Sequence, residues 1–168
     1  MLTNSETQYG LVTKFLHWAI AVLIAFQFAG GVAGIEDDAH ATAGLMVLVL
    51  ACLRVLWRLF VALPDWAPTL SRFERRLVHT YEMVLYAMLF AKPITGLLLM
   101  GADDDEVELF GVFELPALFP ESDYFEDLFE SLHFWTGIVL LIALALHVGL
   151  VLRHQFLLRD GLLRRMLP

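Results

Sequence analysis

Four long apolar stretches constrain this 168-residue chain more than any other feature. They cover residues 15–34, 41–60, 77–100 and 132–152. A helix needs roughly 20 residues to cross a bilayer, and lipid favours helices because every backbone polar group must be satisfied within the segment. We therefore expect an all-α integral membrane protein, a single membrane domain over residues 1–168 folded as a bundle of four transmembrane helices.

The composition supports this expectation and excludes other classes. Hydrophobic residues make up 59% of the chain and charged residues 18%, which is too apolar for a small soluble domain. The net charge of -8 argues against nucleic acid as a partner. Cys52 is the only cysteine, which excludes an intrachain disulfide and a Cys-x-x-Cys zinc site. A cleaved signal peptide is the alternative for the first span, but its apolar run is long for one.

Charged residues divide the segments between the spans into two kinds. Ten of the eleven Lys and Arg residues fall on the side that holds both termini. The opposite segments, 35–40 and 101–131, carry fourteen of the nineteen acids and no Lys or Arg. Because positive residues favour the cytoplasmic side, both termini are predicted to be cytoplasmic.

The outer loop, residues 101–131, is long for a connection within a bundle. From Asp123 onward, acidic and apolar residues alternate at helical spacing. We expect a short interfacial helix there, with Asp123 and Glu126 forming a capping box at its start.

Histidines are the residues in and beside the spans that point to a function. His133 and His147 are fourteen residues apart, so on one helix their rings leave the same face about 21 Å apart. His17 lies at the inner depth of His147, and His40 at the outer depth of His133. Each histidine alone could be an interfacial or hydrogen-bonded residue, but the set predicts two facing pairs, His17 with His147 and His40 with His133.

Two histidines at each depth suit one kind of metal cofactor. Zinc usually takes three or four protein ligands, whereas haem supplies four equatorial ligands itself and needs only two axial ones. Since the chain has no Cys-x-x-Cys-His attachment, the haems would be b-type, and their axial metal ligands would be His17, His147, His40 and His133.

Small residues next to these histidines offer a second test. Each proposed ligand has a small residue one helical turn away, on the side toward the bilayer centre. A flat macrocycle beside the ligand requires such a small neighbour. Packing between helices is the alternative reason for small residues at these positions. The same step from His79 and His154 reaches larger residues, so these two are not expected to bind haem. The four small residues are Ala21, Gly44, Gly137 and Ala143, and the two larger ones are Met83 and Leu150.

Two cations lie within the spans. Arg54 follows His40 by fourteen residues, which places it on the same helix face at the inner depth; we expect it to pair with a haem propionate rather than extend to the inner surface. Lys92 stands beside Pro93, which frees a backbone carbonyl one turn earlier as a local partner. Lys92 either extends to water or contacts an outer-haem propionate or a quinone head group.

Several short motifs carry a resemblance to a known family. They are Tyr9 with Leu16-His17-Trp18, His40 with Gly44 and Arg54, Lys92-Pro93-Ile94-Thr95-Gly96, Ser131-Leu132-His133, His147 and the tail over residues 162–168. On these motifs the chain resembles the prokaryotic cytochrome b-561 family, the diheme four-helix cytochromes of bacterial inner membranes. The resemblance implies two haem b groups, with His17 and His147 on the inner haem and His40 and His133 on the outer. It also implies electron transfer between a periplasmic redox partner and quinone, and ubiquinone is one candidate for that quinone.

The charge of the outer segments bears on the redox partner. Some members of the family resemble superoxide oxidases, but fourteen outer acids would repel the superoxide anion and attract a cationic protein such as a soluble cytochrome c. Alternatively, the acids could reflect only the membrane topology of the chain, or an adaptation to a saline habitat, and have no role in binding a partner. We expect a diheme electron carrier. The alternatives are a haem subunit that anchors a hydrogenase or dehydrogenase and, from another class, a transporter that uses histidines for metal or protons.

Overall fold

The computed structural model describes the chain except for residues 34–36, 67–68, 103–107, 115–118, 120–121 and 168. Its four long helices are α1 (Leu11–Ala33), α2 (Asp37–Phe60), α3 (Arg72–Met100) and α4 (Asp123–Leu152). A six-residue π-helix, η1 (Arg153–Leu158), continues α4, and the short helix α5 (Leu162–Met166) follows. Between α3 and α4, strands β1 (Glu108–Leu109) and β2 (Phe113–Glu114) form an antiparallel hairpin.

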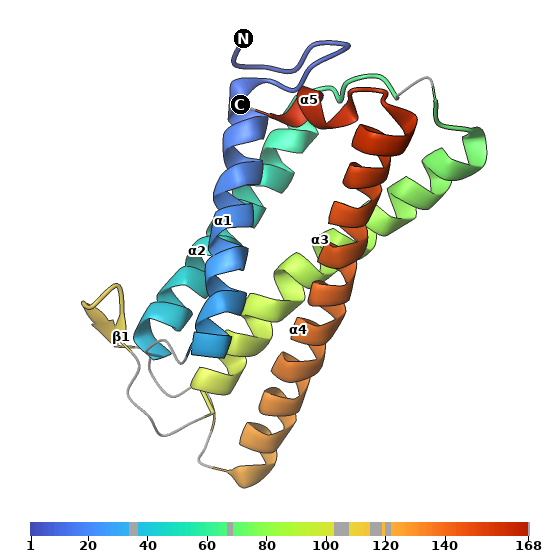
Figure 1. The fold of residues 1–168 in the computed structure, drawn as a ribbon. Helices are drawn as coiled ribbons and strands as arrows, with labels where there is room; N and C mark the ends of the chain where they lie inside the picture. Colours follow the sequence, from blue (N-terminus) through green and yellow to red (C-terminus); the bar gives the residue numbers. More distant parts are fainter. Residues whose placement is uncertain (34–36, 67–68, 103–107, 115–118, 120–121, 168) are drawn as a thin grey trace.

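The long helices form a bundle in which sequence neighbours pack together (Figure 1): α1 on α2, α2 on α3 and α3 on α4. All four are long and apolar enough to cross a membrane, which confirms the predicted helical membrane bundle. A small buried cluster lies between α1, α2 and α3. It consists of Ile20, Ile24, Val47, Ala51 and Leu89.

Most large apolar side chains lie on the outside of the bundle rather than in this core. Leu53, Phe134 and Ile142 are among many that are about half exposed. Exposing so much apolar surface to water would be unfavourable, at about 25 cal/mol per Å². Lipid is therefore the solvent that the outer surface fits.

The helices begin earlier than the predicted spans 15–34, 41–60, 77–100 and 132–152, and the largest difference is at α4. The helix predicted from Asp123 is present, but it is not short and interfacial as expected, because it continues directly into the apolar span as the first part of α4. Nothing in the sequence between Asp123 and the apolar span breaks a helix, neither Gly nor Pro. The predicted capping box was also wrong, since the helix is capped at Ser122 without a side-chain capping bond. The outer loop is correspondingly shorter than residues 101–131.

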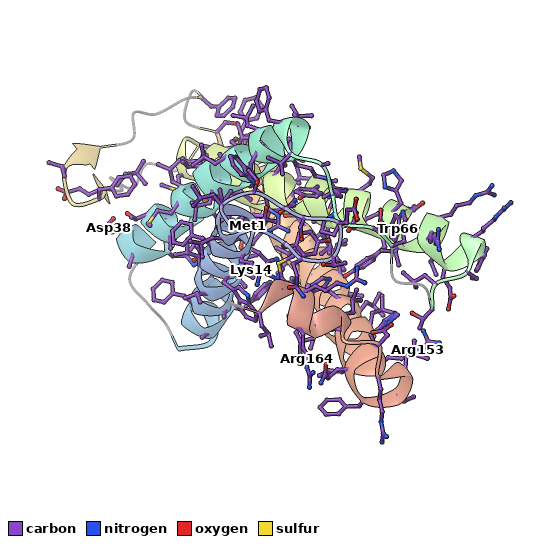
Figure 2. All side chains as sticks on the ribbon, turned by 90° about the horizontal axis from the view of Figure 1, so that it is seen from above. Met1, Lys14, Asp38, Trp66, Arg153 and Arg164 are labelled. Atoms are coloured by element: carbon purple, nitrogen blue, oxygen red, sulfur yellow. The ribbon has the colours of Figure 1, made fainter. Side chains whose placement is uncertain are left out.

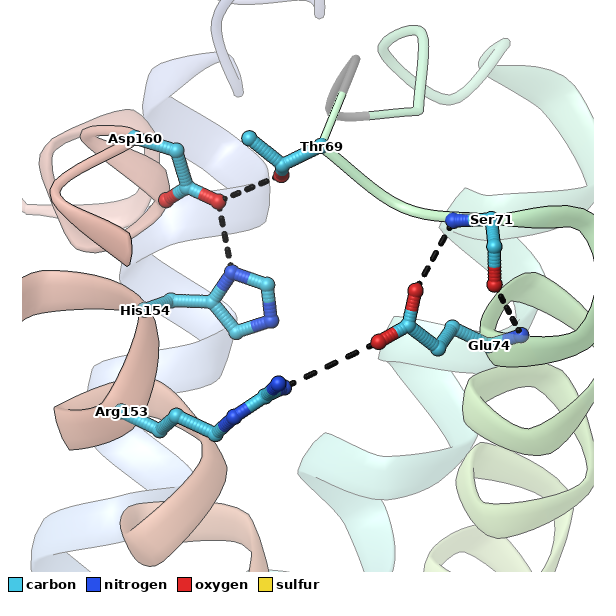
Figure 3. Close-up of polar contacts among 6 residues, drawn as sticks. All are labelled: Thr69, Ser71, Glu74, Arg153, His154 and Asp160. Carbon is cyan, nitrogen blue, oxygen red and sulfur yellow. Dashed lines mark hydrogen bonds and ion pairs between the residues drawn. The ribbon is translucent and has the colours of Figure 1, made fainter. Parts of the chain in front are cut away.

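α3 also begins before its apolar span. Ser71 Oγ accepts a hydrogen bond from the Glu74 amide, and the Glu74 carboxylate accepts one from the Ser71 amide (Figure 3). This capping box satisfies two of the free amides at the start of the helix. The motif Ser-x-x-Glu is present in the sequence. The predicted span nevertheless began later, because it was defined by its apolar residues and the first turns of the helix are charged.

Both termini lie at one end of the bundle, and the hairpin lies at the other (Figure 1). The Tyr9 amide donates to the Arg165 carbonyl and the Trp18 indole to the Met166 carbonyl, so the two ends of the chain are joined directly. Gly10 allows the N-terminal segment to fold back, because a Cβ there would clash with the Leu2 carbonyl oxygen. Figure 2 views the molecule from this end, with Lys14, Arg153 and Arg164 labelled.

Candidate cofactor-binding site

The first predicted pair, His17 and His147, comes together between α1 and α4. The ring centroids are 6.1 Å apart, with 54° between the ring planes. Two aromatic rings flank the pair. Trp18 meets His17 edge-on at 5.5 Å, and Tyr81 of α3 lies nearly parallel to His147. The Tyr81 hydroxyl donates to the carbonyl of Ala143, one turn before His147, which fixes Tyr81 against this part of α4.

The second predicted pair, His40 and His133, comes together between α2 and α4. The ring centroids are 6.2 Å apart, and the angle between the ring planes is 74°. Gln27 of α1 donates a hydrogen bond of 2.9 Å to the His40 carbonyl. His133 contacts Thr95 of α3, with 3.3 Å between Thr95 Oγ1 and the ring Nδ1. Helix geometry places the two pairs about 21 Å apart along α4.

The donor set of each pair fits haem. Two imidazoles that hold one metal ion from opposite sides have ring centroids about 6 Å apart, since each metal–nitrogen bond is about 2 Å. The separations of 6.1 and 6.2 Å agree with that arrangement. In the part of the chain that the structure describes, no three or more His, Cys, Asp or Glu side chains gather as a metal site would require. Two donors at each place suit a cofactor that supplies its own equatorial ligands.

The positions of the pairs in the bundle also suit a flat group. The closest helix packing joins sequence neighbours, α1 with α2, α2 with α3 and α3 with α4. Each histidine pair instead joins two helices that are not sequence neighbours. One pair joins α1 to α4, and the other joins α2 to α4. A planar ligand between facing rings therefore does not have to separate the most tightly packed helices.

The predicted small residues have close neighbours of their own. A Cβ at Gly44 would lie 3.1 Å from Gln27 Nε2, and a Cβ at Gly137 would lie 3.1 Å from Lys92 Nζ. Ala143 is buried. Packing between helices, the alternative reason for small residues, thus has a direct basis at both glycines.

Arg54 lies near His17 and His147, as its spacing predicts. Its guanidinium Nε donates a 3.1 Å hydrogen bond to the Tyr86 hydroxyl of α3. On the next turn of α2, Arg58 pairs with Glu82 at 3.1 Å and lies over the Tyr86 ring. Arg54 therefore has a partner within the protein that sequence reasoning did not name. A guanidinium carries five N–H donors, so one such bond does not exclude a second partner.

Lys92 lies near His133 and is partly buried. Its ammonium donates a 2.9 Å hydrogen bond to the His133 carbonyl of α4. The local carbonyl that Pro93 frees on α3 is thus not the partner observed. This hydrogen bond offsets part of the free energy needed to bury a charge at this depth. Gly137 leaves space for the lysine side chain.

The other two histidines are placed differently. His79 is exposed on α3. His154 is only 4% exposed, and its Nδ1 lies 2.6 Å from Asp160 Oδ2 (Figure 3). Asp160 also accepts hydrogen bonds from Thr69 and from the Leu162 amide. Burial raises the pKa of Asp160, but these hydrogen bonds outweigh it and the pKa is lowered from its ordinary value.

Three residues of α3 near the histidine pairs were missed by sequence reasoning, as was Gln27 of α1. The three from α3 are Tyr81, Thr95 and Tyr86. Each reaches the site from α3, the helix without a proposed ligand. Thr95 alone had a signal, because it lies within the motif Lys92-Pro93-Ile94-Thr95-Gly96. Nothing in the spacing of α3 by itself indicates which helix its tyrosines face.

A lipid-facing four-helix bundle with histidines facing one another across it is the architecture of a membrane electron-transfer protein. The family model described as prokaryotic cytochrome b561 matches residues 8–168. The chain belongs to this family, whose members bind haem b, and it is a multi-pass protein of the inner membrane.

Three relatives match almost their whole length. "Cytochrome b561 homolog 2" of Escherichia coli (strain K12) is 28% identical, over 98% of this chain and 94% of the relative. "Cytochrome b561 homolog 1" of the same organism is 24% identical over 92% and 93%. "Probable superoxide oxidase CybB" of Yersinia pestis is 23% identical over 96% of both chains.

Proposed function

We propose that this chain, as a single membrane domain, binds two b-type haems at different depths and carries electrons across the inner membrane. The observation that supports this most is the presence of two separate histidine pairs, each with ring centroids about 6 Å apart, on one face of α4. His17 and His147 would be the axial ligands of the inner haem, and His40 and His133 those of the outer. A bound haem supplies an iron that takes up and releases one electron.

The protein's own residues hold the ligands and exclude water. Exposed apolar side chains on all four long helices face lipid, so the pairs lie inside an apolar layer. Tyr81 packs beside His147, and Lys92 and Thr95 hold His133 from the neighbouring helix. Arg54 would pair with an inner-haem propionate while it remains bonded to Tyr86.

The donor on the outer side is proposed to be a cationic protein such as a soluble cytochrome c, and the acceptor to be quinone. The outer segments 35–40 and 101–131 contain fourteen acids and no Lys or Arg. The hairpin docks on the outer end of α2, where the Glu108 amide donates to Asp38 and the Phe110 amide donates to Thr42. Asp38 and Glu108 both border a shallow hollow of about 380 Å³ between α2 and the hairpin. A negative surface of this kind steers cations toward it and slows the approach of superoxide.

With the basic residues inside, both termini would be cytoplasmic.

The visible spectrum of the purified protein tests the cofactor proposal. Two haems per chain with low-spin b-type bands are expected. A protein that is expressed with haem supplied and still shows no Soret band would rule the proposal out. Reduction of the haems by a basic cytochrome c and by superoxide should then be compared. The rate with cytochrome c should fall as salt rises, because screening weakens the attraction. A superoxide reaction that is faster and insensitive to salt would instead assign this chain the activity in the name of its Yersinia pestis relative.

A further inference from the structure

The motif Lys92-Pro93-Ile94-Thr95-Gly96 of α3 lies against a single residue of α4, His133. Lys92 Nζ donates to the His133 carbonyl at 2.9 Å, and Thr95 Oγ1 lies 3.3 Å from the ring Nδ1. A Cβ at Gly96 would lie 2.9 Å from the ring Cε1, closer than real side-chain contacts allow. Three residues of the motif thus contact the backbone, a ring nitrogen and a ring carbon of one histidine.

The direction of the Thr95 hydrogen bond follows from the other bonds around it. The Thr95 hydroxyl has one proton, and Oγ1 lies 2.9 Å from the Lys92 carbonyl oxygen, which can only accept. Thr136 is 3.3 Å from Thr95, but its own proton is directed to the carbonyls of Leu132 and His133. Thr95 Oγ1 is therefore left as an acceptor toward His133. A bond between them requires the proton of a neutral imidazole to be on Nδ1, which leaves the Nε2 lone pair free.

Which nitrogen carries the proton matters for a metal ligand. A histidine that ligates through one nitrogen commonly donates its other N–H to a nearby acceptor, which fixes the ring and raises the basicity of the ligand. Thr95 is 9% exposed, so water does not compete strongly for this position. Because Gly96 has no Cβ, the Cε1 edge of the ring can approach α3, where the Thr95 hydroxyl lies close to Nδ1.

We propose that Thr95 is a positioning residue for the outer haem. It holds His133 with Nδ1 protonated and Nε2 directed to the iron. The inference rests on the proposed function, in which His133 is an axial ligand. A hydrogen bond to Nδ1–H makes the imidazole a stronger electron donor, which favours ferric over ferrous iron. The bond should therefore hold the midpoint potential of the outer haem below the value that the same ligands would otherwise give.

The test compares Thr95→Val, which removes the hydroxyl at similar volume, with Thr95→Ser, which retains it. Optical redox titration of each purified protein gives the midpoints, and the midpoint that is absent from His40→Ala protein is assigned to the outer haem. In Thr95→Val the outer midpoint should rise, while the inner one stays in place. Thr95→Ser should return the outer midpoint toward wild type. Thr80→Val, an exposed position on the same helix, is the matched control and should change neither.

Each outcome decides the proposal. Thr95→Val protein with two haems and both midpoints unchanged would overturn it, as would Thr95→Ser behaving like Thr95→Val. Loss of the outer haem in Thr95→Val, with retention in Thr95→Ser, would support it, since losing such a partner weakens metal binding about 10–100-fold. Wild-type protein without a haem spectrum would instead reject the proposed function on which the inference rests.

Discussion

His154 Nδ1 lies 2.6 Å from Asp160 Oδ2, and each side chain is only 5% exposed. Asp160 also accepts a 2.7 Å hydrogen bond from Thr69, which lies just before α3. The pair therefore ties the π-helix that ends α4 to the segment that leads into α3, at the end of the bundle where the termini meet (Figure 3).

Replacement of Asp160 should destabilise the protein in a pH-dependent way. Asp160→Asn should lower the free energy of unfolding by about 1–3 kcal/mol at neutral pH, since a buried hydrogen-bonded acceptor is lost. The folded-state pKa of Asp160 is lowered, so its contribution is complete above the ordinary value of 3.8 and is lost as the pH falls through the lower folded value. Melting temperatures of the two proteins in detergent should differ most near neutral pH, begin to converge below about pH 4, and agree once the pH is below the folded-state pKa of Asp160.

Asp127→Asn, on an exposed face of α4, is the control and should melt like wild type at each pH. A difference between wild type and Asp160→Asn that stays constant down to about pH 3 would show that the carboxylate charge is not what stabilises this contact.

The two histidine pairs should lose haem independently. His17→Ala and His147→Ala should each cost the inner haem, and His40→Ala and His133→Ala the outer, because one axial ligand alone holds a haem more weakly than two. Haem counted per chain should fall from two to one in each variant. His79→Leu, at an exposed position, should keep both haems. Two fully bound low-spin haems in His133→Ala would refute the assignment.

Arg54→Leu should lower the potential of the inner haem. A positive charge near the haem stabilises the ferrous form, and its removal should cost on the order of 1 kcal/mol, or roughly 40 mV for a one-electron couple. Tyr86→Phe removes only the hydroxyl that Arg54 contacts, and it should shift the potential less. Equal shifts in the two variants would mean that Arg54 acts through Tyr86 and not through its charge on the haem.

Lys92→Met removes a charge and the bond to the His133 carbonyl but retains most of the side-chain volume. The outer-haem potential should fall, for the reason given for Arg54, while the haem content and the inner-haem potential stay unchanged. Redox titration measures the potentials, and a quinone-reduction assay shows whether Lys92 also supports the acceptor step. If both match wild type, Lys92 serves only to hold α3 against α4.

The sequence was sufficient for the four apolar spans and for placing His133 and His147 on one face of α4, because both depend on distances along one helix. A fourteen-residue spacing nearly completes four turns, so His133 and His147 share a face whatever surrounds them. Contacts set by the register between helices could not be predicted in this way. Tyr81 beside His147 and Thr95 beside His133 depend on how α3 is placed against α4, and no spacing within either helix determines that.

The start of α4 shows a different limit. Asp123 and the acids after it were assigned to a separate helix because a membrane span is recognised by its apolar run, and charged turns fall outside that run. The helix nevertheless continues through them, since backbone hydrogen bonding does not depend on whether the surroundings are lipid or water. The same reasoning applies to the capped start of α3 at Ser71.

Both histidine pairs take one member from α4, the last of the four long helices to be synthesised. Synthesis proceeds from the N-terminus, so α1, α2 and α3 leave the ribosome before either α4 histidine exists. A nascent chain that has inserted three helices can therefore offer an incoming macrocycle only one axial side of each pair, His17 or His40. With the proposed ligands, their order along the chain would make haem insertion a late event of biogenesis, and an arrested chain that ends before residue 133 would enter the membrane without being able to complete either centre.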